Sequence, residues 1–345
     1  MNCKNRRRPA QSAPGVGGCQ TPSRSREWPG SPAAAAAAYD GRVTFDEAPL
    51  SDPAARWPCI AQARQCRHPR RPLRLRGHLV GSVDERCLPL LQALAPELQC
   101  TPEALLAPPL ADAAAATAWF EPLNLRLRAE GAIPGWRDER YPVLPLQAYT
   151  GAVPLADIER AAARFWGTLT FGAHANGYLA DASGRPTHLW LGRRSATKAT
   201  DPGLLDNLIG GGVPLGQTPF ETLVREGWEE AGLAQPQLHT ARPVRVIQLR
   251  RELPEGLQLE RLYAFDLPLP PGVTPANQDG EVASFQSLPV AEALALAQAG
   301  EMTVDAALVT LDFALRHRLL PADEIGALQA ATAALFMEPG AIQSI

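Results

Sequence analysis

Residues 210–233 read GGGVPLGQTPFETLVREGWEEAGL, a glycine-rich run followed by an acidic segment. The run Thr218 to Glu221 has the S/T-x-x-E form of a capping box with proline at the first helical position, which predicts a helix that starts at Pro219. Gly232 predicts where this helix ends. Apolar residues recur between these limits at helical spacing and predict one buried stripe: Phe220, Leu223, Val224, Gly227 and Ala231.

Three carboxylates crowd the unburied side of this helix. Glu226, Glu229 and Glu230 lie within five residues, and like charges at this spacing destabilise an isolated helix by about 0.2–0.5 kcal/mol per pair. A divalent cation with oxygen ligands would offset the repulsion. The alternative is a solvated acidic face in which Arg225 pairs with Glu229. The glycines before the helix favour the cation, because a tight backbone can approach a metal-bound phosphate: Gly210, Gly211, Gly212 and Gly216.

Aligned from Gly211, the stretch resembles the Nudix box, G-x5-E-x7-R-E-U-x-E-E-x-G-U, in which U is an aliphatic residue. The Arg-Glu-x-x-Glu-Glu-x-Gly core, which carries the metal chemistry in that family, is intact. Two positions depart from the pattern, because Gln217 replaces the first glutamate and Gly227 replaces an aliphatic residue. An amide cannot act as an anionic ligand. Either the first glutamate is dispensable here, or Glu221 takes over its stabilising role.

The wider chain is similar to Nudix hydrolases that carry an N-terminal domain of unknown function and are related to fungal thiamine pyrophosphokinase fusions. The runs GWRDERYPV, FGAHANGYLA and WLGRRSATKATDPG carry this resemblance. It implies a Nudix-type α/β/α sandwich with a mixed sheet, preceded by a smaller α+β domain and a disordered N-terminal tail. We expect a disordered basic tail over residues 1–70, the N-terminal domain over 71–165, the Nudix hydrolase domain over 166–320 and a C-terminal extension over 321–345.

Sequence patterns outside the box agree with this architecture. Residues 187–195, 242–253 and 257–267 are β-like runs, and 288–300 and 303–319 are amphipathic helical runs that would close the second face of a sheet. In the N-terminal domain, residues 75–83 predict a strand or turn, and residues 83–98 and 101–119 predict helices broken by prolines. Leu155, Ile158, Ala162 and Phe165 have helical spacing and predict the helix that ends this domain.

Composition and charge limit the remaining possibilities. A chain of 345 residues with 46% hydrophobic content holds one large or two ordinary domains. No apolar run approaches the ~20 residues that span a bilayer, so we expect no membrane partner. The six cysteines form no CxxC pair, which favours a reduced, cytoplasmic location and argues against zinc.

The front of the chain is basic. Residues 1–76 hold 14 Lys and Arg against 5 Asp and Glu, and the rest holds 19 against 31. Its Pro, Ser, Gly and Ala content predicts disorder. The run RRR at residues 6–8 could contact nucleic acid or be solvated, and we expect solvation. A translation start placed too far upstream and a mitochondrial transit peptide are alternative explanations of this segment.

The resemblance implies that the box binds Mg²⁺ (or Mn²⁺) and that water attacks phosphorus. Glu229 and Glu230 are the first expected metal ligands, Gly211 would add its carbonyl oxygen, and Glu226 is a third ligand or the base that orients water. Arg225 would hold a box carboxylate by bidentate pairing. A further acid from a later loop would be Glu281, next to Asp279, with Glu260 as the alternative.

Three cations upstream of the box are candidates for binding substrate phosphate, or are surface charges: Arg193, Arg194 and Lys198. The aromatic residues Trp136, Tyr141 and Tyr178 could stack on a flat heteroaromatic ring, or belong to the core. Lone histidines such as His174 and His188 are expected to be structural or exposed.

The leading hypothesis is metal-dependent hydrolysis of the diphosphate bond of a small organic diphosphate, with thiamine diphosphate or its oxidised analogues as the substrates that the resemblance implies. An ADP-ribose-like substrate and a noncatalytic ligand sensor on the same fold are alternatives. An isoprenoid diphosphate isomerase would need a cysteine facing the alkene, and no cysteine follows Cys100. We expect no nucleic-acid partner, and the oligomeric state stays open.

Overall fold

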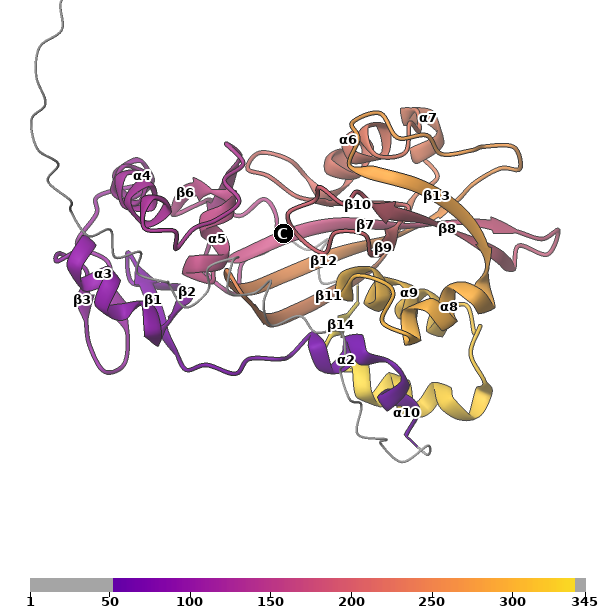
Figure 1. The fold of residues 1–345 in the computed structure, drawn as a ribbon, viewed down its shortest axis with the longest axis horizontal. Coiled ribbons are helices and arrows are strands. Elements are labelled where there is room, and N and C mark those ends of the chain that lie inside the picture. Colours follow the sequence, from indigo (N-terminus) through magenta and orange to yellow (C-terminus); the bar gives the residue numbers. More distant parts are fainter. Residues whose placement is uncertain (1–51, 339–345) are drawn as a thin grey trace, which may run out of the picture.

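A mixed sheet of eight strands forms the larger, C-terminal domain of the computed structural model, which describes residues 52–338 (Figure 1). The strand order is β13-β8-β7-β12-β11-β14, with β9 paired to β8 and β10 paired to β7. Strands β7 and β12 pair in parallel and the other pairs are antiparallel, which confirms the predicted mixed sheet. The strands are β7 (Leu169–Ala180), β8 (Pro186–Arg194), β9 (Leu205–Asn207), β10 (Ile209–Gly212), β11 (Arg242–Leu253), β12 (Gly256–Pro268), β13 (Val282–Pro289) and β14 (Phe336–Met337).

Helices cover both faces of this sheet (Figure 1). Adjacent strand residues point to opposite faces, so Leu262 packs in one core with Leu308 of α9 while Tyr263 packs in another with Leu223 of α6. This arrangement confirms the predicted α/β/α sandwich. The helices of the domain are α6 (Pro219–Glu229), α7 (Gln235–Leu238), α8 (Val290–Gln298), α9 (Val304–Arg316) and α10 (Ala322–Thr332).

The box helix α6 begins and ends where its sequence predicts. The Thr218 hydroxyl accepts a hydrogen bond from the Glu221 amide at 3.2 Å, and the Glu221 carboxylate accepts one from the Thr218 amide at 2.8 Å. Gly232 has a φ of +64°, a left-handed conformation that glycine adopts readily. Gly227 lets α6 pack closely against Leu238 of α7, because a β-carbon at residue 227 would lie 2.8 Å from the Leu238 side chain.

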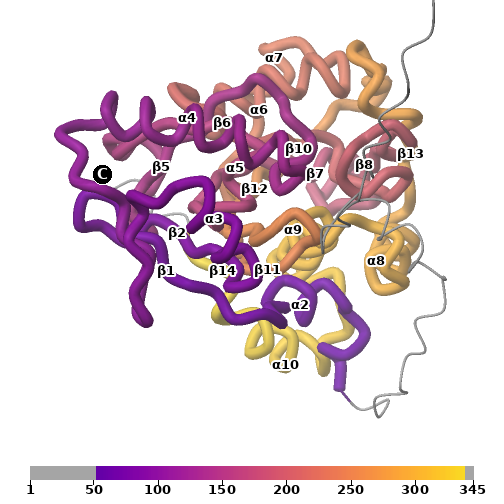
Figure 2. The backbone as a smooth tube through the Cα atoms, turned by 60° about the vertical axis from the view of Figure 1, so that its left-hand side comes forward, coloured from indigo at the N-terminus to yellow at the C-terminus, as the bar shows by residue number. Residues whose placement is uncertain are grey.

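The N-terminal domain is a separate α+β unit with its own core (Figure 2). Its four-stranded sheet has the order β2-β1-β4-β3, and β5 and β6 form a second small sheet. The strands are β1 (Arg70–Leu75), β2 (His78–Asp84), β3 (Gln99–Cys100), β4 (Leu105–Leu106), β5 (Arg140–Val143) and β6 (Ala156–Glu159), and the helices are η2 (Glu85–Cys87), α3 (Leu88–Leu94), α4 (Ala113–Ala129) and α5 (Arg160–Trp166).

Two helix predictions in this domain are wrong in part. The expected helix over Leu155 to Phe165 is a strand up to Glu159, because Ile158 pairs with Tyr141 of β5, and only α5 is helical. The expected helix over residues 101–119 begins at Ala113, where the Asp112 carboxylate accepts a hydrogen bond from the Ala115 amide at 2.8 Å.

The prediction of a disordered tail up to residue 70 is wrong for residues 52–70, while residues 1–51 lie outside the described part of the chain. Residues 53–62 form η1 (Pro53–Arg56) and α2 (Pro58–Gln62). Figures 1 and 2 show α2 beside α10 of the C-terminal domain. Trp57, Cys59 and Ala63 are buried in the same core as α9. The chain therefore starts its described fold in the C-terminal domain, builds the N-terminal domain and returns through β7.

Candidate active site

Arg225 joins the acids of the box helix. Its guanidinium lies 2.8 Å from an oxygen of Glu226 and 2.8 Å from an oxygen of Glu229. The Gln217 amide oxygen accepts hydrogen bonds from the Thr222 hydroxyl at 3.0 Å and from Arg225 Nε at 3.4 Å. Gln217 therefore supports Arg225 with a neutral oxygen. The alternative that Glu221 takes this role is wrong, because Glu221 is used in the helix cap.

Two of the box acids are buried beside the glycine loop. The Glu226 carboxylate lies against the backbone of Gly211. Glu230 accepts a hydrogen bond from the Gly210 amide at 3.0 Å. Burial and the charge of Glu226 raise the pKa of Glu230 to about 8, and burial also raises the pKa of Glu226. Such acids are ready to exchange a proton for a cation.

Lys198 links Glu281, the expected acid from the later loop, to the box. The Lys198 ammonium lies 3.8 Å from a Glu230 oxygen and forms an ion pair with Glu281. Burial lowers the pKa of Lys198. The structure thus brings Glu281, Lys198 and Glu230 together, although they are separated by long stretches of sequence.

A cavity of about 170 Å³ lies at the glycine loop, between the two domains. Gly210, Gly211, Glu260 and Glu281 line it from the C-terminal domain. Burial, followed by the charge of Asp305, raises the pKa of Glu260. The N-terminal domain adds a second set of lining residues: Arg137, Tyr141, Arg160, Ala163 and Arg164.

The contribution of Arg137, Arg160 and Arg164 from the N-terminal domain was not predicted from the sequence, whereas Tyr141 was a candidate. Arg160 and Arg164 lie one helical turn apart on α5, and this spacing was the available signal. The Tyr141 hydroxyl reaches β10 so closely that a β-carbon at Gly212 would lie 1.8 Å from it. The third residue of the GGG run must therefore be glycine for the domains to meet here.

The expected cationic residues divide into two groups. Lys198 and Arg194 line the cavity. Arg194 is nevertheless engaged by Asp206 at 2.7 Å and by the carbonyl oxygen of Thr200 at 2.8 Å. Arg193 does not line the cavity and donates to the Gly203 carbonyl oxygen at 2.7 Å. All three cations therefore have protein partners, and Lys198 and Arg194 are the two that line the cavity.

The three aromatic residues that could stack on a substrate ring do not form one surface, because they lie in different places. Trp136 packs on the core of the N-terminal domain beneath Arg128, 4.7 Å from the ring centre. Tyr178 packs on Phe313 on the opposite face of the large sheet. Tyr141 lines the cavity.

His174 lines the cavity and also belongs to a buried hydrogen-bond network. Its Nδ1 lies 3.0 Å from the Asn207 side-chain oxygen, and its ring packs against Gly210. The Asn207 side-chain amide in turn donates to the Asn176 oxygen at 3.0 Å. This buried network holds the start of the glycine loop in place.

Oxygen donors of the box suit a hard divalent cation. Carboxylates with a backbone carbonyl nearby are the ligands that Mg²⁺ and Mn²⁺ prefer. Burial raises the pKa of Glu226 and of Glu230, although Arg225 pairs with Glu226 at 2.8 Å and Lys198 lies 3.8 Å from Glu230. The residues present therefore fit such an ion.

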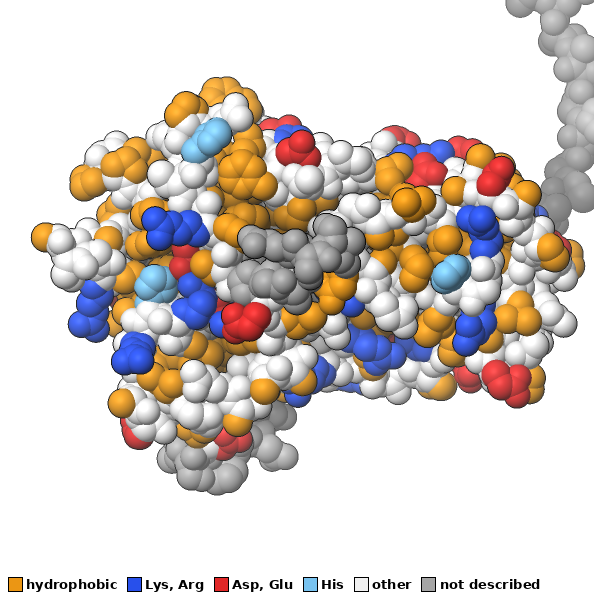
Figure 3. Space-filling model, turned by 180° about the vertical axis from the view of Figure 1, so that it is seen from behind, with side chains coloured by type: hydrophobic (Ala, Val, Ile, Leu, Met, Phe, Trp, Pro, Cys, Tyr) orange, Lys and Arg blue, Asp and Glu red, His pale blue; other side chains and the backbone are white. Residues whose placement is uncertain are grey.

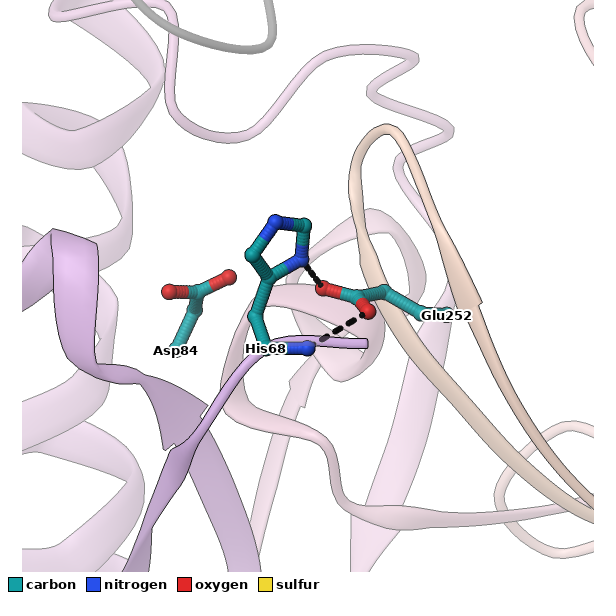
Figure 4. A group of neighbouring side chains, drawn as sticks. All are labelled: His68, Asp84 and Glu252. Atoms are coloured by element: carbon teal, nitrogen blue, oxygen red, sulfur yellow. Dashed lines mark hydrogen bonds and ion pairs between the residues drawn. The ribbon is translucent and has the colours of Figure 1, made fainter. Parts of the chain in front are cut away.

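A second group of potential ligands lies away from the box, where His68, Asp84 and Glu252 place ligand atoms within 4.8 Å of one another (Figure 4). Figure 4 shows Glu252 bound to His68. Glu252 also accepts from the Arg67 amide at 2.7 Å, and Asp84 pairs with Arg86 at 2.6 Å. These partners already satisfy both acids. The bonds from Glu252 on β11 to Arg67 and His68 instead connect the C-terminal domain to the segment before β1.

Comparison with known proteins agrees with this geometry. Residues 170–308 match the NUDIX domain. Residues 56–170 match a domain of unknown function, DUF4743. The NUDIX domain thus contains β10, α6 and Glu281, and the DUF4743 match includes Trp57, which the predicted boundary at residue 71 excluded.

Curated relatives include two proteins of Arabidopsis thaliana, Nudix hydrolase 24, chloroplastic, and Nudix hydrolase 20, chloroplastic. They are 38% and 37% identical over 200 residues, which cover 58% of this chain and 53% and 52% of theirs. The chain spans about half the length of these relatives. Among solved structures, DR0079 of Deinococcus radiodurans is 24% identical with a TM-score of 0.36, covering 50% of this chain and 97% of that one.

The molecular surface and the helices bear on the remaining partner predictions. Figure 3 shows Lys and Arg side chains distributed over one face, with Asp and Glu between them, and no continuous basic surface among the described residues there. Within residues 52–338, no helix has the length and apolar character needed to cross a bilayer.

Proposed function

We propose that this protein hydrolyses the diphosphate bond of a small organic diphosphate with the help of Mg²⁺ or Mn²⁺. The observation that carries the proposal is the pair of buried box acids, Glu226 and Glu230, held at the glycine loop beside an interdomain cavity. The NUDIX match over residues 170–308 supports the same chemistry.

The cation would be held mainly by the three box acids, Glu229, Glu230 and Glu226. The Gly211 carbonyl oxygen and Glu281 would be its further ligands. The bound cation neutralises phosphate oxygens and lowers the pKa of water. Arg225 keeps Glu226 and Glu229 in position. Glu226, buried and with a raised pKa, is the alternative base that orients the attacking water.

We further propose thiamine diphosphate or an oxidised analogue as the substrate. Support comes from the resemblance of GWRDERYPV and FGAHANGYLA to the thiamine-associated Nudix proteins. Tyr141 of the first run lines the cavity. The reaction would add water across the anhydride and release the monophosphate and inorganic phosphate.

A parallel assay tests both levels of this proposal. Purified protein with Mg²⁺ is offered thiamine diphosphate, its oxidised forms, ADP-ribose and nucleoside triphosphates, and released phosphate and monophosphate are measured. We expect thiamine compounds to be turned over fastest, and Glu230→Gln to lose at least about 100-fold in rate, as removal of an essential electrostatic group does. Arg185→Gln, in the exposed turn after β7, is the matched control.

The other outcomes separate the alternatives. Faster turnover of ADP-ribose would refute the thiamine assignment and leave the hydrolase intact. Binding without turnover, equal in wild type and Glu230→Gln, would show a ligand sensor.

A further inference from the structure

A second cavity, of about 430 Å³, adjoins the one at the glycine loop. The two cavities share four lining residues: Arg137, Arg160, Arg164 and Thr200. The second cavity contains none of the box residues, and Pro134, Ala161, Ala199 and Pro254 make much of its wall uncharged. The three arginines, called here the arginine wall, therefore stand between the glycine-loop cavity and a larger, less polar space, which Glu255 also lines.

Two arginines of the arginine wall have carboxylate partners and the third, Arg137, has none among the described residues. Arg160 pairs with Glu139 at 2.8 Å, and Arg164 pairs with Glu255. The Arg137 side chain has no hydrogen bond or ion pair with any residue of the described range 52–338. Desolvation and repulsion from Arg160 and Arg164 lower the pKa of Arg137. An anion placed among the three guanidinium groups would relieve this repulsion.

Other cations of the glycine-loop cavity are already paired. Arg194 is held by Asp206, and Lys198 by Glu281. Arg251 donates to the Gln258 side-chain oxygen at 2.6 Å and lies 3.6 Å from Asp201. Arg137, which is exposed to solvent, is thus the arginine whose side chain has no partner among the described residues, and it lies on the side of the cavity that leads into the second one.

We propose that the arginine wall binds the phosphate of the substrate that is bonded to its organic group, and that this group occupies the second cavity. This inference rests on the proposed hydrolase function and deepens it, because it makes the N-terminal domain the part that selects the substrate. Guanidinium groups bind phosphate oxygens through paired N–H donors. A volume near 430 Å³ lies at the lower end of the ~300–1,000 Å³ typical of ligand sites, so it suits a small organic group.

The first experiment uses methylenediphosphonate, a diphosphate analogue that cannot be hydrolysed at its bridge. Its affinity for the full chain with Mg²⁺ is measured by calorimetry for wild type, Arg137→Gln, Arg137→Lys and the control Arg185→Gln, which also loses one exposed positive charge. We expect Arg137→Gln to weaken binding by about 10-fold or more, as loss of a charge-assisted hydrogen bond does. Arg137→Lys should keep part of the affinity. Equal affinity of Arg137→Gln and Arg185→Gln would overturn the proposal.

The second experiment fills the second cavity with Ala199→Phe, which leaves the arginine wall unchanged. Methylenediphosphonate should bind this variant as it binds wild type, while thiamine diphosphate and ADP-ribose, whose organic groups need the space, should both bind at least about fivefold more weakly. Unchanged binding of both organic diphosphates would refute the assignment of this cavity.

These results remain distinct from a failure of the proposed function. If no organic diphosphate is hydrolysed while methylenediphosphonate binding still depends on Arg137, the hydrolase proposal fails and the anion site of the arginine wall stands.

Discussion

At the scale of single residues, burial separates three glutamates that the sequence presents as equals. The side chain of Glu229 is 41% exposed and pairs with Arg225, whereas Glu226 and Glu230 are buried at the glycine loop. Removing a carboxylate from water favours its protonated form. In the metal-free protein, ionisation is therefore most unfavourable at Glu230, because burial raises its pKa to about 8.

This raised pKa predicts a pH-dependent effect of Glu230→Gln on stability without metal. Below the ordinary glutamate pKa near 4.5, wild-type Glu230 is protonated in both folded and unfolded chains, so the substitution changes little. As pH rises from there to about 8, the unfolded chain loses this proton and the folded chain keeps it, which costs wild-type stability. Glutamine avoids this cost, so the gain should be largest above pH 8.

Thermal unfolding in EDTA at pH 5 and pH 8.5 checks this prediction. Glu230→Gln should raise the melting temperature by roughly 2–4 °C or more at pH 8.5 and by much less at pH 5, which lies close to the ordinary glutamate pKa. Adding Mg²⁺ should stabilise wild type more than the variant. A variant less stable than wild type at pH 8.5 would contradict the raised pKa of Glu230.

Which residues form the box was predictable from sequence, because they lie on one helix and its preceding loop. Their environments were not, since Lys198, Glu281 and Arg160 reach the site only through the fold. Gln217 is an example of what the sequence left open. Its amide oxygen accepts a hydrogen bond from Arg225, but the spacing of the residues alone did not show whether Gln217 or Glu221 has this role.

At the scale of elements, the contact between β10 and β5 fixes how the two domains meet. Gly212 of β10 and the Tyr141 hydroxyl of β5 are too close for a side chain at residue 212. Gly212→Ala should therefore destabilise the protein by about 1–3 kcal/mol, as overpacking does. Tyr141→Phe removes the overlapping oxygen, so the nearest ring atom would lie 3.1 Å from the new β-carbon.

The double variant tests this contact. Adding Tyr141→Phe to Gly212→Ala should recover part of the lost stability, measured by urea unfolding of all four proteins. Strictly additive losses would show that the two residues do not meet.

Long helices and strands with a clear sequence pattern formed where the sequence predicts them: α6, α8, α9, β8, β11 and β12. The segment from Leu155 to Phe165 did not. Its apolar spacing fits a helix locally, but pairing of Ile158 with Tyr141 makes its first part a strand. Short segments are decided by partners that lie elsewhere in the chain.

At the scale of the whole molecule, the described N-terminal segment belongs to the core of the NUDIX domain. Trp57 and Ala63 are buried beside α9. The Ala63 carbonyl oxygen accepts a hydrogen bond from the Arg250 amide at 2.9 Å. A chain that starts at the predicted domain boundary, Arg71, would therefore lack part of this core.

We predict that a chain starting at Arg71 is less stable than one starting at Asp52, and that Trp57→Ala in the full chain loses about 3–5 kcal/mol, as large buried aromatic residues do. Trp136→Ala, which removes a partly exposed tryptophan, should lose less. Urea unfolding measures all four proteins. Equal stability of the two truncated chains would show that α2 is dispensable.

The position of α2 also has a consequence for synthesis of the chain. The Arg64 guanidinium donates to the Ala331 carbonyl oxygen at 3.2 Å, across 267 residues of sequence. Ribosomes add roughly 5–20 residues per second, so about 13–50 s separate the appearance of these partners. During much of that interval the core that buries Trp57 and Ile60 is incomplete, because α9 and α10 supply part of it. A nascent chain of this protein should therefore be a substrate for chaperones until its last helix emerges.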